Sequence, residues 1–222
     1  MNSFINVLLL VASAPTFLLA IFVGFDLPLE MLRIQAREIP YLSYIFLGLA
    51  AILFALSLRR TIRRWSGLYL VNQRKKYLFN EEIKKERKKR VIVYTVLESV
   101  IIAYLGYSYT ALTQDAWAPS AVMYAFAAEG ILFLAFGLLT RKFRIGVTSK
   151  AVLVADREVS VLYFSGLRQV SISQQSIYFE YIENLQLNFP LDCLDAENKS
   201  DFFDTLQQVV DNEKVLFRVH EG

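Results

Sequence analysis

Two carboxylates inside long apolar segments are the residues of this sequence best placed to do chemistry. Glu98 lies in the otherwise uncharged stretch 91–113, and Glu129 lies in the stretch 120–140. Counted at 1.5 Å per residue from Val91 and from Thr140, Glu98 would lie about 10 Å and Glu129 about 16 Å below the cytoplasmic membrane face. A charged carboxylate at such depth is costly, so each must be protonated, paired or hydrated.

These intramembrane carboxylates have two interpretations. They could relay protons or cations, or they could be protonated glutamates hydrogen-bonded across helices or facing a partner subunit. We favour the structural interpretation, because no Lys, Arg, His or Asp accompanies the two glutamates within the apolar segments.

Other chemistry has little support in the sequence. Cys193 is the only cysteine and His220 the only histidine, which argues against an intrachain disulfide and a His/Cys metal site. The serines and acidic residues show no nucleophile–base arrangement, and no glycine-rich phosphate loop is present. We therefore expect a protein that is not an enzyme and that uses no cofactor or metal.

A basic block, residues 59–90, sets the orientation of the chain. It carries thirteen Lys and Arg residues against three Glu, and apolar segments flank it on both sides. Short loops rich in Lys and Arg stay in the cytoplasm, so this block is predicted to be a cytoplasmic helical hairpin that contacts anionic lipid. Nucleic acid is not expected as a partner, because the bilayer already supplies phosphates. The predicted lipid contacts are Arg59, Arg60, Arg63, Arg64, Arg74, Lys75, Lys76, Lys88, Lys89 and Arg90.

Composition and segment length predict a multi-pass membrane protein. The chain has 222 residues, 55% of them hydrophobic, and a mean hydropathy of +0.37. Four segments are long enough to cross about 30 Å of hydrocarbon. With the basic block inside, both termini lie in the cytoplasm, as expected for a bacterial inner-membrane protein. The predicted spans are residues 4–25, 41–58, 91–113 and 120–140.

The sequence also predicts the local structure of the connections between these spans. Residues 26–40 are predicted to hold a short interfacial helix with Leu29, Leu32 and Ala36 on one face. The second helix is predicted to continue through Arg64 or Trp65 and to break at Gly67. Asn80, followed by two glutamates, has the features of a helix start.

Residues 141–222 differ in character from the membrane part, residues 1–140. Six short alternating segments, KFRIGVT, AVLVAD, VSVLYF, LRQVSIS, SIYFEY and NLQLNF, predict β-strands separated by turns. Residues 195–210 then place Phe202 and Leu206 on one face of an amphipathic helix. The fold class is therefore a four-helix membrane protein with a C-terminal α+β domain.

The C-terminal segment resembles bacterial PH-like domains attached to membrane helices. The resemblance lies in IGVTSKAVLVAD entering a hairpin, LRQVSIS as a middle strand, and LNFPLDCL before the helix that contains FFDTLQQVV. It implies a bent antiparallel sheet of roughly seven strands capped by one helix. In that family the fold serves docking rather than catalysis.

These patterns together predict an accessory or scaffolding subunit of a larger membrane assembly. Its PH-like domain would dock a partner by a sheet edge or an acidic face, and other membrane protein subunits would be its partners. The alternative is a small ion- or proton-coupled transporter or channel component that uses Glu98 and Glu129. Residues 141–222 hold nine basic and twelve acidic residues, so we also expect this domain to rest against the basic block, with Lys88 near Asp201.

The topology gives a first testable prediction. A cysteine introduced at Asn72, within the basic block, should not react with a membrane-impermeant thiol reagent in intact spheroplasts, and should react after lysis. The Lys/Arg bias is the reason, because it keeps this loop on the cytoplasmic side. Labelling of the cysteine at position 72 in intact spheroplasts would show that the topology is inverted.

Overall fold

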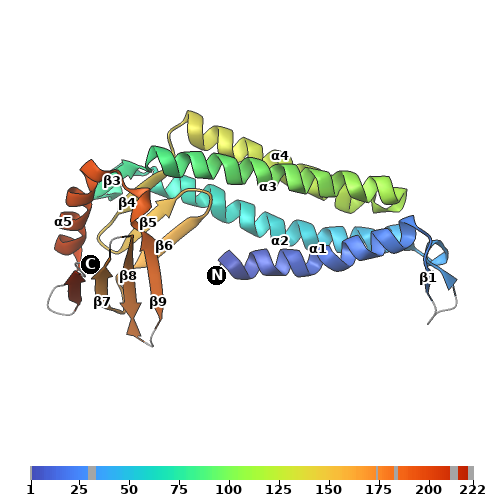
Figure 1. Cartoon of the computed structure of the whole chain (residues 1–222), viewed down its shortest axis with the longest axis horizontal. Helices are drawn as coiled ribbons and strands as arrows, with labels where there is room; N and C mark the ends of the chain where they lie inside the picture. Colours follow the sequence, from blue (N-terminus) through green and yellow to red (C-terminus); the bar gives the residue numbers. More distant parts are fainter. Residues whose placement is uncertain (1, 30–33, 174, 183–184, 211–214, 220–222) are drawn as a thin grey trace. The chain divides into compact units, whose positions relative to one another are not determined.

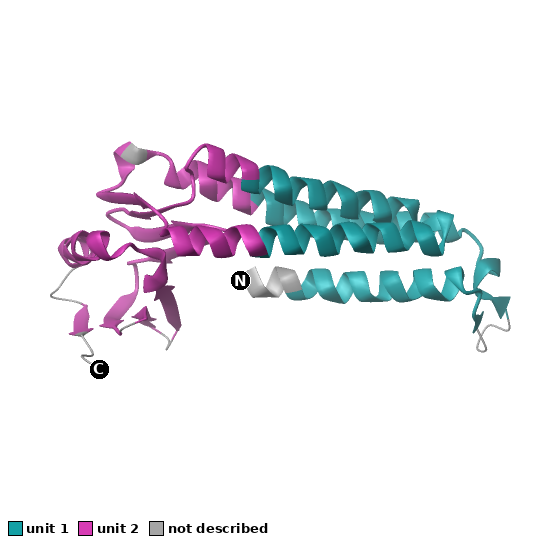
Figure 2. Cartoon of the chain, turned by 45° about the horizontal axis from the view of Figure 1, so that its top comes forward, with its two compact units in different colours: residues 1–62, 94–134 teal, residues 63–93, 135–222 magenta. Residues whose placement is uncertain are grey.

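The computed structural model describes residues 2–29, 34–173, 175–182, 185–210 and 215–219. The chain forms two compact units, each assembled from two separate stretches of sequence (Figure 2). The membrane unit comprises Met1–Ile62 and Tyr94–Leu134, and the sheet unit comprises Arg63–Val93 and Ala135–Gly222.

Four helices of the described chain are long and apolar enough to cross a membrane (Figure 1). Their apolar parts confirm the four predicted segments, and Pro15 lies inside the first helix. The second helix passes through Gly67, where a break was predicted. Glycine serves close packing there, because the Val159 side chain fills the space that a Cβ at residue 67 would occupy. The helices are α1 (Asn2–Gly24), α2 (Leu42–Val71), α3 (Lys85–Leu112) and α4 (Trp117–Leu139).

The connection between α1 and α2 differs from the predicted interfacial helix. It forms a two-stranded hairpin of β1 (Pro28–Leu29) and β2 (Ile34–Gln35), followed by a 3-10 turn, η1 (Ala36–Glu38). Arg37 explains the difference, because its guanidinium donates hydrogen bonds to the carbonyls of Val23 and Gly24 at the end of α1. Ala36 of the predicted helix face is buried in the 3-10 turn, whereas Leu32 lies outside the described residues.

Tyr109 of α3 lies at the centre of the packing in the membrane unit. It is almost fully buried, and its ring meets the ring of Phe17 edge-on at a centroid distance of 5.6 Å. Its hydroxyl donates to the Ser13 carbonyl at 3.4 Å. Gly24 lies against Leu112, where a Cβ would come within 2.8 Å of the Leu112 carbonyl oxygen. Small and aromatic residues together therefore fix α1 against α3.

The sheet unit contains two four-stranded sheets (Figure 1). All six strands predicted after residue 140 are confirmed, and each pairs antiparallel with a strand next to it in sequence. One sheet has the order β3-β4-β5-β6, and the other has the order β10-β7-β8-β9 with β10 parallel to β7. The strands are β3 (Phe79–Glu82), β4 (Arg144–Val147), β5 (Ala151–Ala155), β6 (Val159–Tyr163), β7 (Leu167–Ile172), β8 (Ser176–Tyr181), β9 (Gln186–Pro190) and β10 (Leu216–Val219).

Strand β3 corrects the prediction that a helix begins at Asn80. Residues Phe79–Glu82 pair with β4, and α3 begins only at Lys85. The Asn80 side chain donates to the Val71 carbonyl at 2.8 Å and accepts a hydrogen bond from Arg144. Long-range pairing has therefore outweighed the local features of a helix start.

Helix α5 (Lys199–Val209) covers the sheets with a buried aromatic face. Phe202 is fully buried, stacks on Phe189 at 5.1 Å between centroids and meets Phe79 edge-on at 5.4 Å. Leu206 is also fully buried, so the predicted inner face is confirmed. The predicted helix 195–210 begins as a 3-10 turn, Ala196–Asn198, before it becomes α-helical.

A buried thiol, Cys193, lies in the short 3-10 turn η5 (Leu191–Cys193) between β9 and α5. Burial raises the pKa of the Cys193 thiol to about 12, from 9.0 in an exposed cysteine. At a pH below both values, this rise lowers the thiolate fraction about a thousandfold. The folded state also keeps a proton that the unfolded chain releases above pH 9.0, so this group lowers stability as the pH rises toward about 12.

Thiol labelling tests this placement. Cys193 of the native protein in detergent should stay unmodified by a maleimide mass tag under conditions that modify an exposed cysteine completely, and it should react fully in SDS. The Lys150→Cys variant is the matched control, because residue 150 is exposed in the same unit and should take up one tag in the native state. Stoichiometric native labelling of Cys193 at the rate of the cysteine at position 150 would contradict its burial.

Candidate functional site

Arg60 of α2 and Glu98 of α3 form an ion pair in the membrane unit. The Arg60 side chain is 18% exposed and the Glu98 side chain is 27% exposed. This pair corrects the expectation that no basic residue accompanies Glu98. Arg60 follows the apolar part of the second span in sequence, but α2 continues as a helix beyond it and so brings the guanidinium to α3.

The pair lies away from the ends of its helices. Arg60 is 18 residues, or about 27 Å, from Leu42 at the start of α2. Glu98 is 14 residues, or about 21 Å, from Leu112 at the end of α3. A hydrocarbon core about 30 Å thick that began at these two ends would contain both charges in its last third. Mutual neutralisation is what allows a charged pair at that depth.

Glu129 is brought to the same level on α4. Gly130, its neighbour, lies so close to α3 that a Cβ there would come within 2.5 Å of the Ser99 hydroxyl. Each of these contact residues is the direct neighbour of a predicted carboxylate, since Ser99 follows Glu98 and Gly130 follows Glu129. The structure therefore brings both predicted carboxylates to one level, on helices in close contact, with Glu129 half-buried.

Small and polar residues bring α3 and α4 close together at a second level as well. Ser120 donates from its hydroxyl to the Gly106 carbonyl at 2.6 Å, about two turns or more from the Ser99–Gly130 contact. Thr95 and Ser99, one turn apart on α3, are both buried. Close packing and the neutralised Arg60–Glu98 pair together hold these helices in register. This arrangement favours a structural role for the carboxylate, because a proton relay would require the Arg60–Glu98 pair to separate.

The basic block has several different environments. Arg59, Lys75, Lys76 and Lys89 are exposed, so lipid contact stays a prediction for them. Arg64 is buried and Arg63 is half-buried. Lys88 forms an ion pair with Glu82, and the side chain of Arg74 lies outside the described residues.

Two arginines at the start of α3 hold the acidic part of the sheet unit. Arg87 contacts the Asp156 carboxylate at 2.7 Å and the Asp192 carboxylate at 3.3 Å, and Arg90 contacts Asp192 at 2.8 Å. The expectation that residues 141–222 rest against the basic block is thereby confirmed. Lys88 pairs with Glu82 of β3 and Asp201 is exposed on α5, so the proximity of Lys88 and Asp201 stays a prediction.

Sequence reasoning included Arg87 in the basic block but missed Asp156 as its partner. Asp156 sits in the turn between β5 and β6, and its second carboxylate oxygen accepts the backbone N–H of Glu158 at 3.1 Å. A turn-forming Asp is common, so its type alone does not indicate an ion pair. Asp192, in contrast, lies close in sequence to several other acidic residues before α5, so the charge pattern of residues 141–222 does draw attention to it.

Among the described residues, no group of three or more His, Cys, Asp or Glu side chains is arranged to hold a metal ion. Comparison with protein-family models, with curated proteins and with solved structures finds no match to this chain.

The Arg60–Glu98 pair gives a testable coupling. Arg60→Gln or Glu98→Gln alone should lower the free energy of unfolding by about 1–3 kcal/mol, because each leaves one charge without its partner at membrane depth. The double variant should lose less than the sum of the two. Unfolding in mixed dodecyl maltoside and SDS micelles would measure these differences.

Arg59→Gln is the matched control for this cycle, since residue 59 is adjacent and exposed and the charge change is the same. It should change the free energy of unfolding by less than about 0.5 kcal/mol. Additive losses in the double variant would show that the pair contributes no coupling.

Proposed function

We propose that this protein is a non-catalytic accessory or scaffolding subunit of a larger assembly in a bacterial inner membrane. Its four apolar helices would anchor it, and its sheet unit would dock a partner on the cytoplasmic side. Both termini and the basic block would lie in the cytoplasm, as the Lys/Arg bias favours. The exposed cations at residues 59, 75, 76 and 89 would contact anionic lipid headgroups.

The architecture of the sheet unit supports a PH-like domain. Strands β4 to β9 form two antiparallel groups of three, and α5 follows them with its aromatic face buried. Strand β3 brings the antiparallel strands to seven, the number that the resemblance implies. Strand β10 adds a parallel partner to β7.

An exposed apolar cluster in the sheet unit is the observation that carries the docking proposal. Its members are Tyr163, Ile182 and Leu185, which are 60%, 56% and 53% exposed. Large apolar side chains gathered on a soluble domain mark an interaction surface more often than isolated ones do. We call these three residues the docking patch.

Backbone contacts bring the docking patch together. The Tyr181 hydroxyl donates to the Tyr163 carbonyl at 2.7 Å, which joins the ends of β6 and β8. The Tyr181 N–H donates to the Leu185 carbonyl at 2.8 Å, and the Ile182 N–H donates to the Gly166 carbonyl. All three residues therefore lie at one end of the sheet unit, and their side chains are exposed there.

The occupant we propose is an extended segment of a partner protein. Strand β9 leads away from the docking patch and forms the edge of its sheet in the described chain. An edge strand offers unpaired backbone groups to an added strand, while adjacent apolar side chains supply pockets and specificity.

The alternative function is a small ion- or proton-coupled transporter or channel component that uses Glu98 and Glu129. The Arg60–Glu98 ion pair favours the structural role, because a carboxylate bound to a guanidinium must leave it before it can carry a proton.

Site-specific photocrosslinking tests the docking proposal in cells. A benzophenone amino acid at Ile182 should give a protein adduct heavier than the chain itself. Tyr163→Ser together with Leu185→Ser should reduce that adduct about tenfold, because loss of two buried contacts costs roughly 1.4 kcal/mol or more. The same probe at Leu216, which is 51% exposed on the opposite edge strand β10, is the matched control and should give no such adduct.

Equal adducts from positions 182 and 216 would show that the docking patch is not selective. An adduct of twice the chain mass would identify a second copy as the occupant instead of another protein. Adducts to lipid alone would contradict protein docking at this surface.

A further inference from the structure

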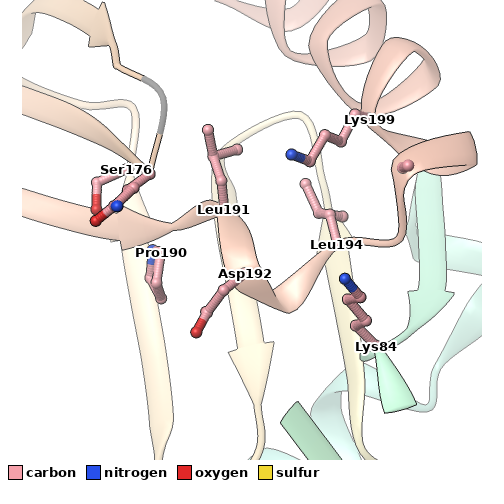
Figure 3. Close-up of a pocket in the computed structure, with 9 residues that line it drawn as sticks. Lys84, Ser176, Pro190, Leu191, Asp192, Leu194 and Lys199 are labelled. Atoms are coloured by element: carbon pink, nitrogen blue, oxygen red, sulfur yellow. The ribbon is translucent and has the colours of Figure 1, made fainter. Parts of the chain in front are cut away.

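A groove of about 520 Å³ opens in the sheet unit between the ends of β8 and β9 and the start of α5 (Figure 3). It lies away from the docking patch, since it adjoins the first residue of β8 and the last of β9, whereas the patch adjoins their opposite ends. Its size is within the range of small-molecule sites in proteins.

Two lysines reach this groove from distant parts of the chain. Lys84 precedes α3, and Lys199 is the first residue of α5. Figure 3 shows the two ammonium ends on either side of Leu194, the Lys199 end facing Leu191, while the Asp192 carboxylate points away from both. The backbone fixes this arrangement, because the Lys84 N–H donates to the Cys193 carbonyl at 2.9 Å.

The charges around the groove leave these two ammonium groups available. Asp192 is the acidic residue of the lining, and its carboxylate is already held by Arg87 and Arg90. Lys84 has only a loose contact, 3.6 Å, with the exposed carboxylate of Glu86. No ion pair of Lys199 occurs within the described part of the chain. An anion entering the groove would therefore meet two lysines with little competition.

The remaining lining defines the rest of the ligand. Leu191 and Leu194 are nearly buried and, with Pro190, give the groove an apolar wall. Ser176, across the groove, can donate or accept a hydrogen bond. Two lysines match the double negative charge of a phosphate monoester, and Lys is a frequent phosphate ligand.

We propose that this groove binds an organic phosphate monoester, with the phosphate between Lys84 and Lys199 and an uncharged body against Leu191, Leu194 and Pro190. The ligand could be a soluble phosphorylated compound or the headgroup of a phosphomonoester lipid, which share this chemistry. The site is independent of the docking patch, so it can be tested whether or not a partner protein is found.

Binding is tested with the full chain in phosphatidylcholine nanodiscs. One arm titrates adenosine monophosphate and glycerol 3-phosphate by calorimetry, and the other arm compares nanodiscs with and without phosphatidic acid. The readout common to both is native-state labelling of Cys193, which lies in the turn that forms the groove wall. At a free ligand concentration ten times Kd, labelling through local opening should slow about elevenfold.

The Lys84→Gln/Lys199→Gln variant should weaken binding at least about tenfold. The Lys85→Gln/Lys150→Gln variant is the matched control, because it removes the same charge from exposed residues of the same unit and should bind normally. Protection by the soluble compounds that depends on Lys84 and Lys199 supports a soluble ligand. Protection that requires phosphatidic acid supports a lipid ligand.

Three results would overturn the proposal. They are no protection of Cys193 by either source, equal binding by both lysine variants, and protection by an acidic peptide but by neither phosphate. The last result would reassign the groove to a peptide carboxylate. Because none of these readouts uses the docking patch, failure here leaves the proposed docking function intact, and failure of docking leaves this site intact.

Discussion

The antiparallel ladder between β3 and β4 is the interaction on which the sheet unit depends. It pairs Phe79 with Val147 and Glu82 with Arg144, and so adds the segment between α2 and α3 to a sheet made from residues after 140. Without β3, β4 would present an open edge, and Phe202 would lose one of its two main aromatic neighbours. The ladder also sets where α3 begins, because only two residues lie between its last residue, Glu82, and Lys85.

Position along the chain decides what each cation of the basic block does. Arg60 neutralises a carboxylate within the membrane unit, whereas Arg87 and Arg90 hold Asp156 and Asp192 in the sheet unit. Single exposed ion pairs contribute little, but these pairs are partly buried, and Arg87 and Arg90 share the Asp192 carboxylate. Some cations of this block thus form ion pairs within the folded chain, and only the exposed cations are available to contact lipid headgroups.

Most of the helices and strands could be predicted from the spacing of apolar residues in the sequence. Long apolar runs placed the four helices, and short alternating segments placed β4 to β9, because these patterns follow from burial within each element. β3 escaped prediction because four residues with two glutamates look like a helix start until a distant partner strand is known. The hairpin after α1 escaped for the same reason, since Arg37 gains its partners only from the carbonyls that end α1.

The residues of the candidate site were also predictable only in part. The carboxylates Glu98 and Glu129 could be found from sequence, because a lone charge in an apolar run is conspicuous. The partner of Glu98 could not, since Arg60 lies beyond the apolar run and becomes a neighbour only when α2 continues as a helix. The groove lysines share no sequence pattern, being 115 positions apart in the chain.

The strand order has a consequence for biosynthesis. Asn80 and Arg144, which are hydrogen-bonded across the β3–β4 ladder, lie 64 positions apart, and α3 and α4 are both made between them. During synthesis β3 must therefore wait until both intervening helices have left the ribosome and β4 has emerged. Such a contact of high sequence separation forms late. The sheet can therefore be completed only after α3 and α4 have taken up positions that bring β4 next to β3. A chain that stops folding before that point would expose an unpaired strand to the quality-control machinery of the cell.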